Sequence, residues 1–152
     1  YKRQEITPKN TSNSVLSSIQ AVREQFRKEY IQSFVSLKGI CQRWGLPISK
    51  GVMNKNKVEE LVSESKKIPQ EVKDWLLELL QSCRELQKRL NKISKYLKEY
   101  ADNDEICQKI MSVPGIGPIT ATRLKATIGD IQRFEKPKSI VAYYGLVSCN
   151  FN

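Results

Sequence analysis

The sequence predicts an all-α protein, with a long helical hairpin or coiled coil followed by a small domain of shorter helices. Two long stretches carry apolar residues at steps of three and four, the spacing of an amphipathic helix. A third stretch, rich in glycine and proline, lies between two short helical segments and indicates a tight turn. The 152 residues, 39% of them hydrophobic, suffice for one ordinary domain or two small ones.

The first long helix is expected over residues 15–44. Its apolar steps average about 3.6 residues, the period of an amphipathic α-helix. Ser14 or Asn13 offers an N-cap oxygen, and Gly45 followed by Pro47 predicts the end of the helix. The apolar positions are Val15, Ile19, Val22, Phe26, Tyr30, Phe34, Leu37, Cys41 and Trp44.

A second long helix is expected from Pro69 onward, after a loop over residues 47–56 and a short helix over 57–67. Here the apolar steps alternate between four and three without a break, which averages about 3.5 residues and is the coiled-coil period. The apolar positions are Val72, Leu76, Leu79, Cys83, Leu86, Leu90, Ile93, Leu97 and Tyr100.

The two apolar stripes can pair as an antiparallel hairpin over residues 14–103. Trp75, Leu80 and Tyr96 widen the second stripe beyond what a two-stranded coiled coil covers, so we expect further helices from a second copy of the chain. The alternative is a core formed within one chain. Residues 1–13 are polar and without a period, which indicates an arm or the remnant of a linker.

Charge and composition limit the classes of function. The chain has 26 basic and 16 acidic residues, a net charge of +10, which favours a polyanionic partner. It contains no histidine, so catalysis by histidine is excluded, and so are zinc sites that contain histidine. The four cysteines have no metal-site spacing and are expected to be reduced thiols. No apolar run is long enough for a membrane span.

The stretch that carries most information runs from Val113 to Leu124, directly after a short helix expected over residues 104–111. Two glycines on either side of one apolar residue make a tight turn, and Pro118 suits the first turn of the next helix. Such a turn leaves the N–H groups of Gly115, Gly117 and the following helix start unpaired. With the helix dipole behind them, these groups form an anion site.

This arrangement resembles the helix-hairpin-helix module, which grips DNA backbone phosphates without reading bases. Ile116 would fill the space between the two helices, and Arg123 or Lys125 would add charge near a phosphate. The alternative is a plain corner between two helices that uses glycine for geometry alone. The candidate nucleic-acid-binding residues are Gly115, Ile116, Gly117, Thr120, Arg123 and Lys125.

The last third of the chain resembles the C-terminal domain of insertion-sequence transposases of the IS110 family, especially its IS1111 branch. The match covers Val-Pro-Gly-Ile-Gly-Pro-Ile-Thr-Ala-Thr at 113–122, Ile-Gly-Asp at 128–130, Phe134, and Ala-Tyr with Gly-Leu-Val within 142–147. Weaker similarity extends upstream, at residues 22–25, 38–39 and 44–46. Residues 137–146 are expected to form another short helix with a packed aromatic face.

The resemblance implies a transposase with three parts. They are an N-terminal RNase-H-like domain whose carboxylates bind divalent metal, a coiled coil that joins protomers, and a C-terminal domain with a nucleophilic serine; some members use a structured guide RNA. Residues 14–103 would be the coiled coil and 104–152 the start of the C-terminal domain. The carboxylate domain is absent from this sequence, and Ser148 stands where the family has proline, so neither catalytic nor metal residues are assigned.

We therefore expect a fragment or truncated copy of a transposase, without cofactor and inactive alone. It would form a homo-oligomer through its long helices and bind DNA, or a structured guide RNA, nonspecifically in the bacterial cytoplasm near the nucleoid. One alternative is a helical oligomerisation module without a nucleic-acid role. Another is an active recombinase that uses Ser148, which a serine-linked DNA adduct lost in Ser148→Ala would reveal; we expect none.

Overall fold

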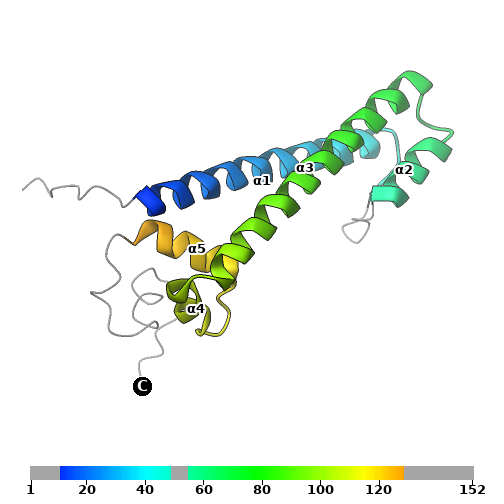
Figure 1. Cartoon of the computed structure of the whole chain (residues 1–152). Helices are drawn as coiled ribbons and strands as arrows, with labels where there is room; N and C mark the ends of the chain where they lie inside the picture. Colours follow the sequence, from blue (N-terminus) through cyan, green and yellow to red (C-terminus); the bar gives the residue numbers. More distant parts are fainter. Residues whose placement is uncertain (1–10, 49–54, 129–152) are drawn as a thin grey trace, which may run out of the picture. The chain divides into compact units, whose positions relative to one another are not determined.

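The computed structural model describes residues 11–48 and 55–128. Over these ranges the chain forms five helices and no strand, so the all-α prediction is confirmed. Of the arm expected over residues 1–13, residues 1–10 lie outside the described residues, whereas residues 11–13 belong to the first helix, so the arm prediction is wrong there. The helix expected over 137–146 also lies outside the described residues. The helices are α1 (Thr11–Arg43), α2 (Lys55–Glu64), α3 (Gln70–Asp102), α4 (Glu105–Met111) and α5 (Pro118–Thr127) (Figure 1).

The C-terminus of α1 lies where the sequence predicts it. Gly45 has a left-handed φ of 73°, which glycine adopts at little cost. Its N–H donates to the carbonyl of Gln42 at 3.0 Å, and the N–H of Leu46 donates to the carbonyl of Cys41 at 2.9 Å. These two bonds form a Schellman motif, which satisfies the last carbonyls of the helix. The start of α1, at Thr11, lies earlier than expected.

The chain divides into two compact units, and each takes part of both long helices. Among the described residues, the first contains residues 11–22 and 93–128, and the second contains residues 23–48 and 55–92. Within the described residues, the first unit thus joins the start of α1 to the end of α3, α4 and α5. The functional boundaries expected at residues 13 and 103 stay a prediction.

In the second unit, α2 covers part of the widened stripe of α3. Leu80, which the sequence analysis assigns to a contact with a second copy, is instead buried in the same cluster as Val58 and Val62 of α2. The guanidinium of Arg84 on α3 pairs with Glu59 on α2. Trp75, in contrast, is 76% exposed. The buried cluster consists of Leu37, Cys41, Ile48, Val58, Val62, Ile68, Leu76 and Leu80.

In the first unit, the buried face of α1 is not the one expected from the periodicity. Val15 and Val22 are 53% and 47% exposed, whereas Leu16 and Gln20 are buried. The reason is that α5 lies beside the first turns of α1 (Figure 1), where Gln20 donates to the carbonyl of Ile119 at 3.2 Å. The face that meets α5 contains polar residues, which a hydropathy pattern does not identify as buried.

A buried apolar cluster in the first unit holds α4 and α5 together. Its buried members come from the end of α3, from α4 and from α5, and Ile116 in the connecting turn packs against them. The sequence-based expectation that Ile116 fills the space between the helices agrees with this position. The buried residues are Ala101, Cys107, Ile110, Val113, Ala121, Leu124 and Ile128.

The structure also shows the surroundings of three cysteines and of Gly39. Cys41, Cys83 and Cys107 are free and buried, in agreement with their assignment to apolar helix faces. At Gly39, within α1, a Cβ would meet no atom within 4 Å among the described residues, so no close helix approach there requires glycine. No helix within residues 11–48 and 55–128 has both the length and the apolar character required to cross a bilayer.

Candidate nucleic-acid interface

The candidate site is the turn between α4 and α5. Asp104 begins α4 as its N-cap and accepts a hydrogen bond from the N–H of Cys107 at 2.9 Å. After α4 the N–H of Val113 donates to the carbonyl of Ile110, and Gly115 takes a φ of 89° that favours glycine. Pro118 is the first residue of α5, as the sequence predicts, and Gly117 is its N-cap.

The turn presents backbone amides that have no partner in the described part of the chain. No acceptor within residues 11–48 and 55–128 pairs with the N–H groups of Gly115, Gly117, Ile119 and Thr120. The N–H of Ile116 is different, because it donates to the carbonyl of Val113 at 3.2 Å. The amides without a partner are therefore those of both glycines and of the first turn of α5, the groups that the sequence analysis names. The amide of Ile116 is not one of them.

Gly117 occupies open space with an ordinary backbone conformation. Its φ of −93° and ψ of 177° are accessible to any residue. A Cβ at this position would meet no atom within 4 Å among the described residues. Neither the local backbone nor packing within the described chain therefore requires glycine here. A bound group that approaches the backbone closely would account for it.

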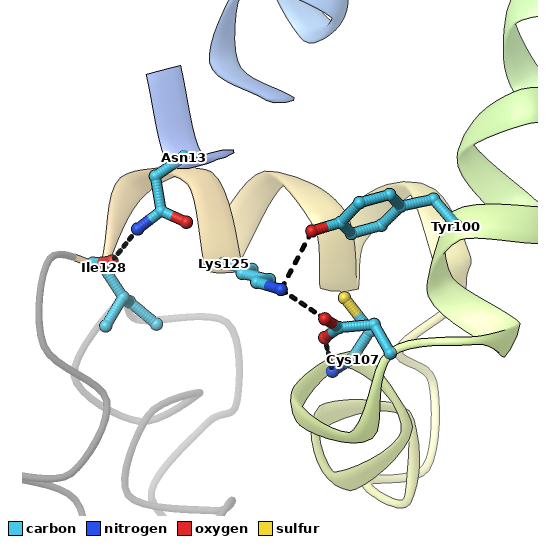
Figure 2. Close-up of polar contacts among 6 residues, drawn as sticks. Asn13, Tyr100, Cys107, Lys125 and Ile128 are labelled. Atoms are coloured by element: carbon cyan, nitrogen blue, oxygen red, sulfur yellow. Dashed lines mark hydrogen bonds and ion pairs between the residues drawn. The ribbon is translucent and has the colours of Figure 1, made fainter. Parts of the chain in front are cut away.

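The three candidate side chains on α5 occupy different environments. Arg123 is exposed on α5, and Thr120 is half-buried in its first turn. Lys125 is turned inward, where its ammonium pairs with the carboxylate of Asp104 and donates to the hydroxyl of Tyr100 at 2.9 Å (Figure 2). Lys125 therefore forms an ion pair inside the first unit, which the sequence analysis did not anticipate.

Burial and hydrogen bonding oppose one another in this ion pair. Burial alone raises the pKa of Asp104, but the hydrogen bonds from Lys125 and Cys107 outweigh it and hold the pKa below its usual value. Burial lowers the pKa of Lys125, yet the bonds with Asp104 and Tyr100 outweigh it and raise the pKa. Both groups are therefore charged at neutral pH. Burial and the charge of Asp104 raise the pKa of Cys107 to about 12, so its thiol is protonated.

Polar contacts from α1 hold α5 at both of its ends. Asn13 donates to the carbonyl of Ile128 at 3.2 Å (Figure 2), after the last turn of α5. Gln20 donates to the hydroxyl of Thr122 at 2.7 Å and to a carbonyl in the first turn. The sequence analysis names Asn13 only as a candidate N-cap of α1, which begins earlier at Thr11, and it does not single out Gln20. A single buried amide side chain leaves no periodic signal in a sequence.

The described residues of the first unit carry almost no net charge. Residues 93–128 carry five basic and four acidic side chains, and residues 11–22 carry none, so this part of the first unit is almost neutral. Fifteen basic and nine acidic residues lie within 23–92. An anion at the turn would therefore be held by aligned N–H groups and the dipole of α5 rather than by a local cluster of lysine and arginine.

No group of three or more histidine, cysteine, aspartate or glutamate residues converges to hold a metal ion within residues 11–48 and 55–128. Ser148, the serine considered in the sequence analysis, lies outside the described residues.

Known proteins with similar sequences are transposases of insertion sequences. The chain is 25% identical to the transposase for IS1328 of Yersinia enterocolitica over 142 residues, covering 93% of this chain and 42% of the relative. It is 27% identical to the transposase for IS1111A of Coxiella burnetii over 143 residues, covering 91% of this chain and 39% of the relative. A probable family 20 transposase of Pseudomonas aeruginosa is 28% identical over 87 residues, 57% of this chain and 26% of the relative.

The similarity to one transposase family lies in the C-terminal third of the chain. Residues 107–152 match the profile of the transposase IS116/IS110/IS902 family, and this match includes α4, the turn and α5. The chain is therefore similar to transposases of the IS116/IS110/IS902 family, which confirms the resemblance seen in its motifs. It spans about two fifths of the length of the two insertion-sequence transposases named first. No solved structure matches the chain.

Proposed function

We propose that this chain is a transposase segment that holds DNA through its sugar-phosphate backbone, with the turn Gly115–Pro118 as the phosphate site. The observation that carries the proposal is Gly117, which is open on its Cβ side and begins a helix whose first amides lack acceptors in the described chain. A phosphate oxygen accepts hydrogen bonds from such amides and is favoured by the helix dipole. The similarity to transposases and the net charge of +10 support DNA as the polyanion.

Backbone recognition has a consequence that can be measured. Amides that bind phosphate oxygens do not touch base edges, so affinity should be the same for duplexes of unrelated sequence. Each phosphate contact also displaces condensed counterions, so affinity should fall steeply as salt is added. The test is a titration of the whole chain with two fluorescent duplexes of scrambled sequence at several salt concentrations.

The outcomes separate three interpretations. Equal, salt-dependent affinity for both duplexes supports the proposal. A clear preference for structured RNA over duplex DNA of equal length would replace DNA with RNA as the ligand of this surface. Absence of salt-dependent binding to either nucleic acid would refute the phosphate site and leave the α4–α5 turn as a plain helical corner.

A second candidate function, assembly of several copies, rests on an exposed apolar stripe in the first unit. Val15, Ile19 and Val22 follow one another on α1 at steps of four and three, and Val15 and Val22 are about half exposed. A groove of about 180 Å³ lies at the start of this stripe, between the Val15 and Ile19 side of α1 and the side chains of Tyr96 and Tyr100 on α3. We propose that the same stripe of a second copy packs here, since heptad spacing is self-complementary in coiled coils.

Assembly is tested by analytical ultracentrifugation of Val15→Lys with Val22→Lys. The expected result is an oligomer for the unmodified chain and dissociation in the double variant, because two buried ammonium groups would oppose the contact. Val35→Lys with Ile31→Lys is the matched control, since these residues are also exposed on α1 but lie in the second unit. An oligomer that binds neither DNA nor RNA would favour the oligomerisation module without a nucleic-acid role.

A further inference from the structure

The residue that joins α3, α4 and α5 is Asp104. One oxygen of its carboxylate accepts from the N–H of Cys107 at 2.9 Å and so caps α4. The other oxygen accepts from the ammonium of Lys125 on α5. The same ammonium donates to the hydroxyl of Tyr100 on α3 at 2.9 Å and lies 5.0 Å from the centre of its ring (Figure 2). One carboxylate and one ammonium therefore link three helices.

The surroundings of this pair make it sensitive to the loss of either partner. The side chains of Lys125 and Asp104 are only 12% and 21% exposed. A charge left in this position without its partner would be poorly solvated, so the helices would have to move to restore solvation. Because α4 and α5 are the two helices that flank the turn, such a movement changes the direction of the amides at Gly115 and Gly117.

We infer that Asp104 and Lys125 are positioning residues, which hold α4 and α5 at the angle that aims the turn amides at a phosphate, and that Lys125 does not itself bind the phosphate. This inference rests on the proposed function. It assigns to Lys125 a role different from the one expected from its sequence position, since its charge is already paired inside the unit. The exposed Arg123 keeps the role of a candidate phosphate ligand.

The two roles for Lys125 predict opposite effects of Asp104→Asn. If Lys125 positions the helices, loss of the Asp104 charge weakens DNA binding. If Lys125 binds phosphate, the same change releases its ammonium and strengthens binding. Asp102→Asn is the matched control, because it removes the same charge from an exposed residue two positions away. Asparagine retains the ability to cap α4 in the first variant.

The experiment measures duplex DNA affinity of the whole chain against salt for Asp104→Asn, Lys125→Met and the double variant. Each single variant should bind roughly two- to thirtyfold more weakly than Asp102→Asn or the unmodified chain. The salt slope should stay unchanged, whereas loss of a phosphate ligand lowers it by about 0.9. The double variant should bind better than the sum of the single effects predicts, because no unpaired charge remains.

A second measurement is independent of DNA. In the ¹H–¹⁵N spectrum of the free chain, the amide signals of Gly115 and Gly117 should shift in Asp104→Asn and Lys125→Met and stay in place in Asp102→Asn. If the unmodified chain binds no DNA, the proposed function fails while these shifts still decide whether the pair sets the turn. Unmoved glycine signals, or stronger binding by Asp104→Asn than by Asp102→Asn, would overturn the inference.

Discussion

Substitution of Gly117 by aspartate should move stability and DNA binding in opposite directions. The backbone at Gly117 is extended, as N-cap residues usually are, and the space on its Cβ side is open. An aspartate there can accept from the N–H of Thr120 and places a negative charge at the positive end of the α5 dipole. These effects should raise the free energy of unfolding by about 0.3–1 kcal/mol.

The same side chain occupies the space that a phosphate would need. It satisfies an amide that the phosphate would use and repels the phosphate by its charge. A hydrogen bond between an amide and a charged oxygen contributes about 1.5–3 kcal/mol, so loss of one such bond should weaken binding at least roughly tenfold. Thermal unfolding followed by circular dichroism and fluorescence anisotropy with a labelled duplex measure the two effects.

The control for this prediction is Gly39→Asp. Gly39 is exposed within α1 in the second unit, and a Cβ there meets no atom within 4 Å, so the substitution adds the same charge without filling the turn. Gly117→Asp should bind DNA at least roughly tenfold more weakly than Gly39→Asp. Equal affinities of the two folded variants would refute the assignment of the turn as a phosphate site.

Four further outcomes follow from the structure. Gly39→Ala should raise the free energy of unfolding by about 1 kcal/mol in denaturant titrations without changing DNA affinity, because alanine is the better helix former; a destabilised variant would indicate a contact at this position. Leu80→Ala should lower the free energy of unfolding by about 2–5 kcal/mol, since Leu80 is buried under α2. A loss below about 1 kcal/mol would contradict that packing. Asp104→Asn should lower the melting temperature near neutral pH. The difference in melting temperature between the variant and the unmodified chain should shrink as the pH falls below the ordinary carboxyl pKa of 3.8. The reason is that a lowered pKa stabilises the fold only while Asp104 is ionised; a gap that persists in acid would exclude its charge as the cause. Cys107 should resist alkylation in the native chain at pH 8 and react in denaturant, as read by peptide mass spectrometry, because it is buried with its pKa raised to about 12.

The long helices could be predicted because their signals are local. The end of α1 follows from Gly45, which adopts the left-handed conformation that the sequence indicates. Most of the predicted stripe of α3 is buried, since alternating steps of four and three place leucines on one face. The start of α5 at Pro118 follows from the fixed φ of proline. None of these features depends on distant parts of the chain.

The contacts of the first unit could not be predicted in the same way. Asn13 and Gln20 are buried because α5, about one hundred residues later in the chain, supplies their acceptors. Likewise Lys125 has the sequence position of a phosphate ligand, but Asp104 and Tyr100 take its charge inside. Sequence spacing indicates which face a residue occupies, whereas its polar partner depends on how the helices pack.

The most direct test of the phosphate site is a ¹H–¹⁵N titration of the labelled whole chain with a short DNA duplex. The amide signals of Gly115, Gly117 and Thr120 should shift with the same saturation curve as the anisotropy change, and a duplex of scrambled sequence should produce the same shifts. Binding of DNA that leaves these three signals in place and shifts others would contradict the central claim.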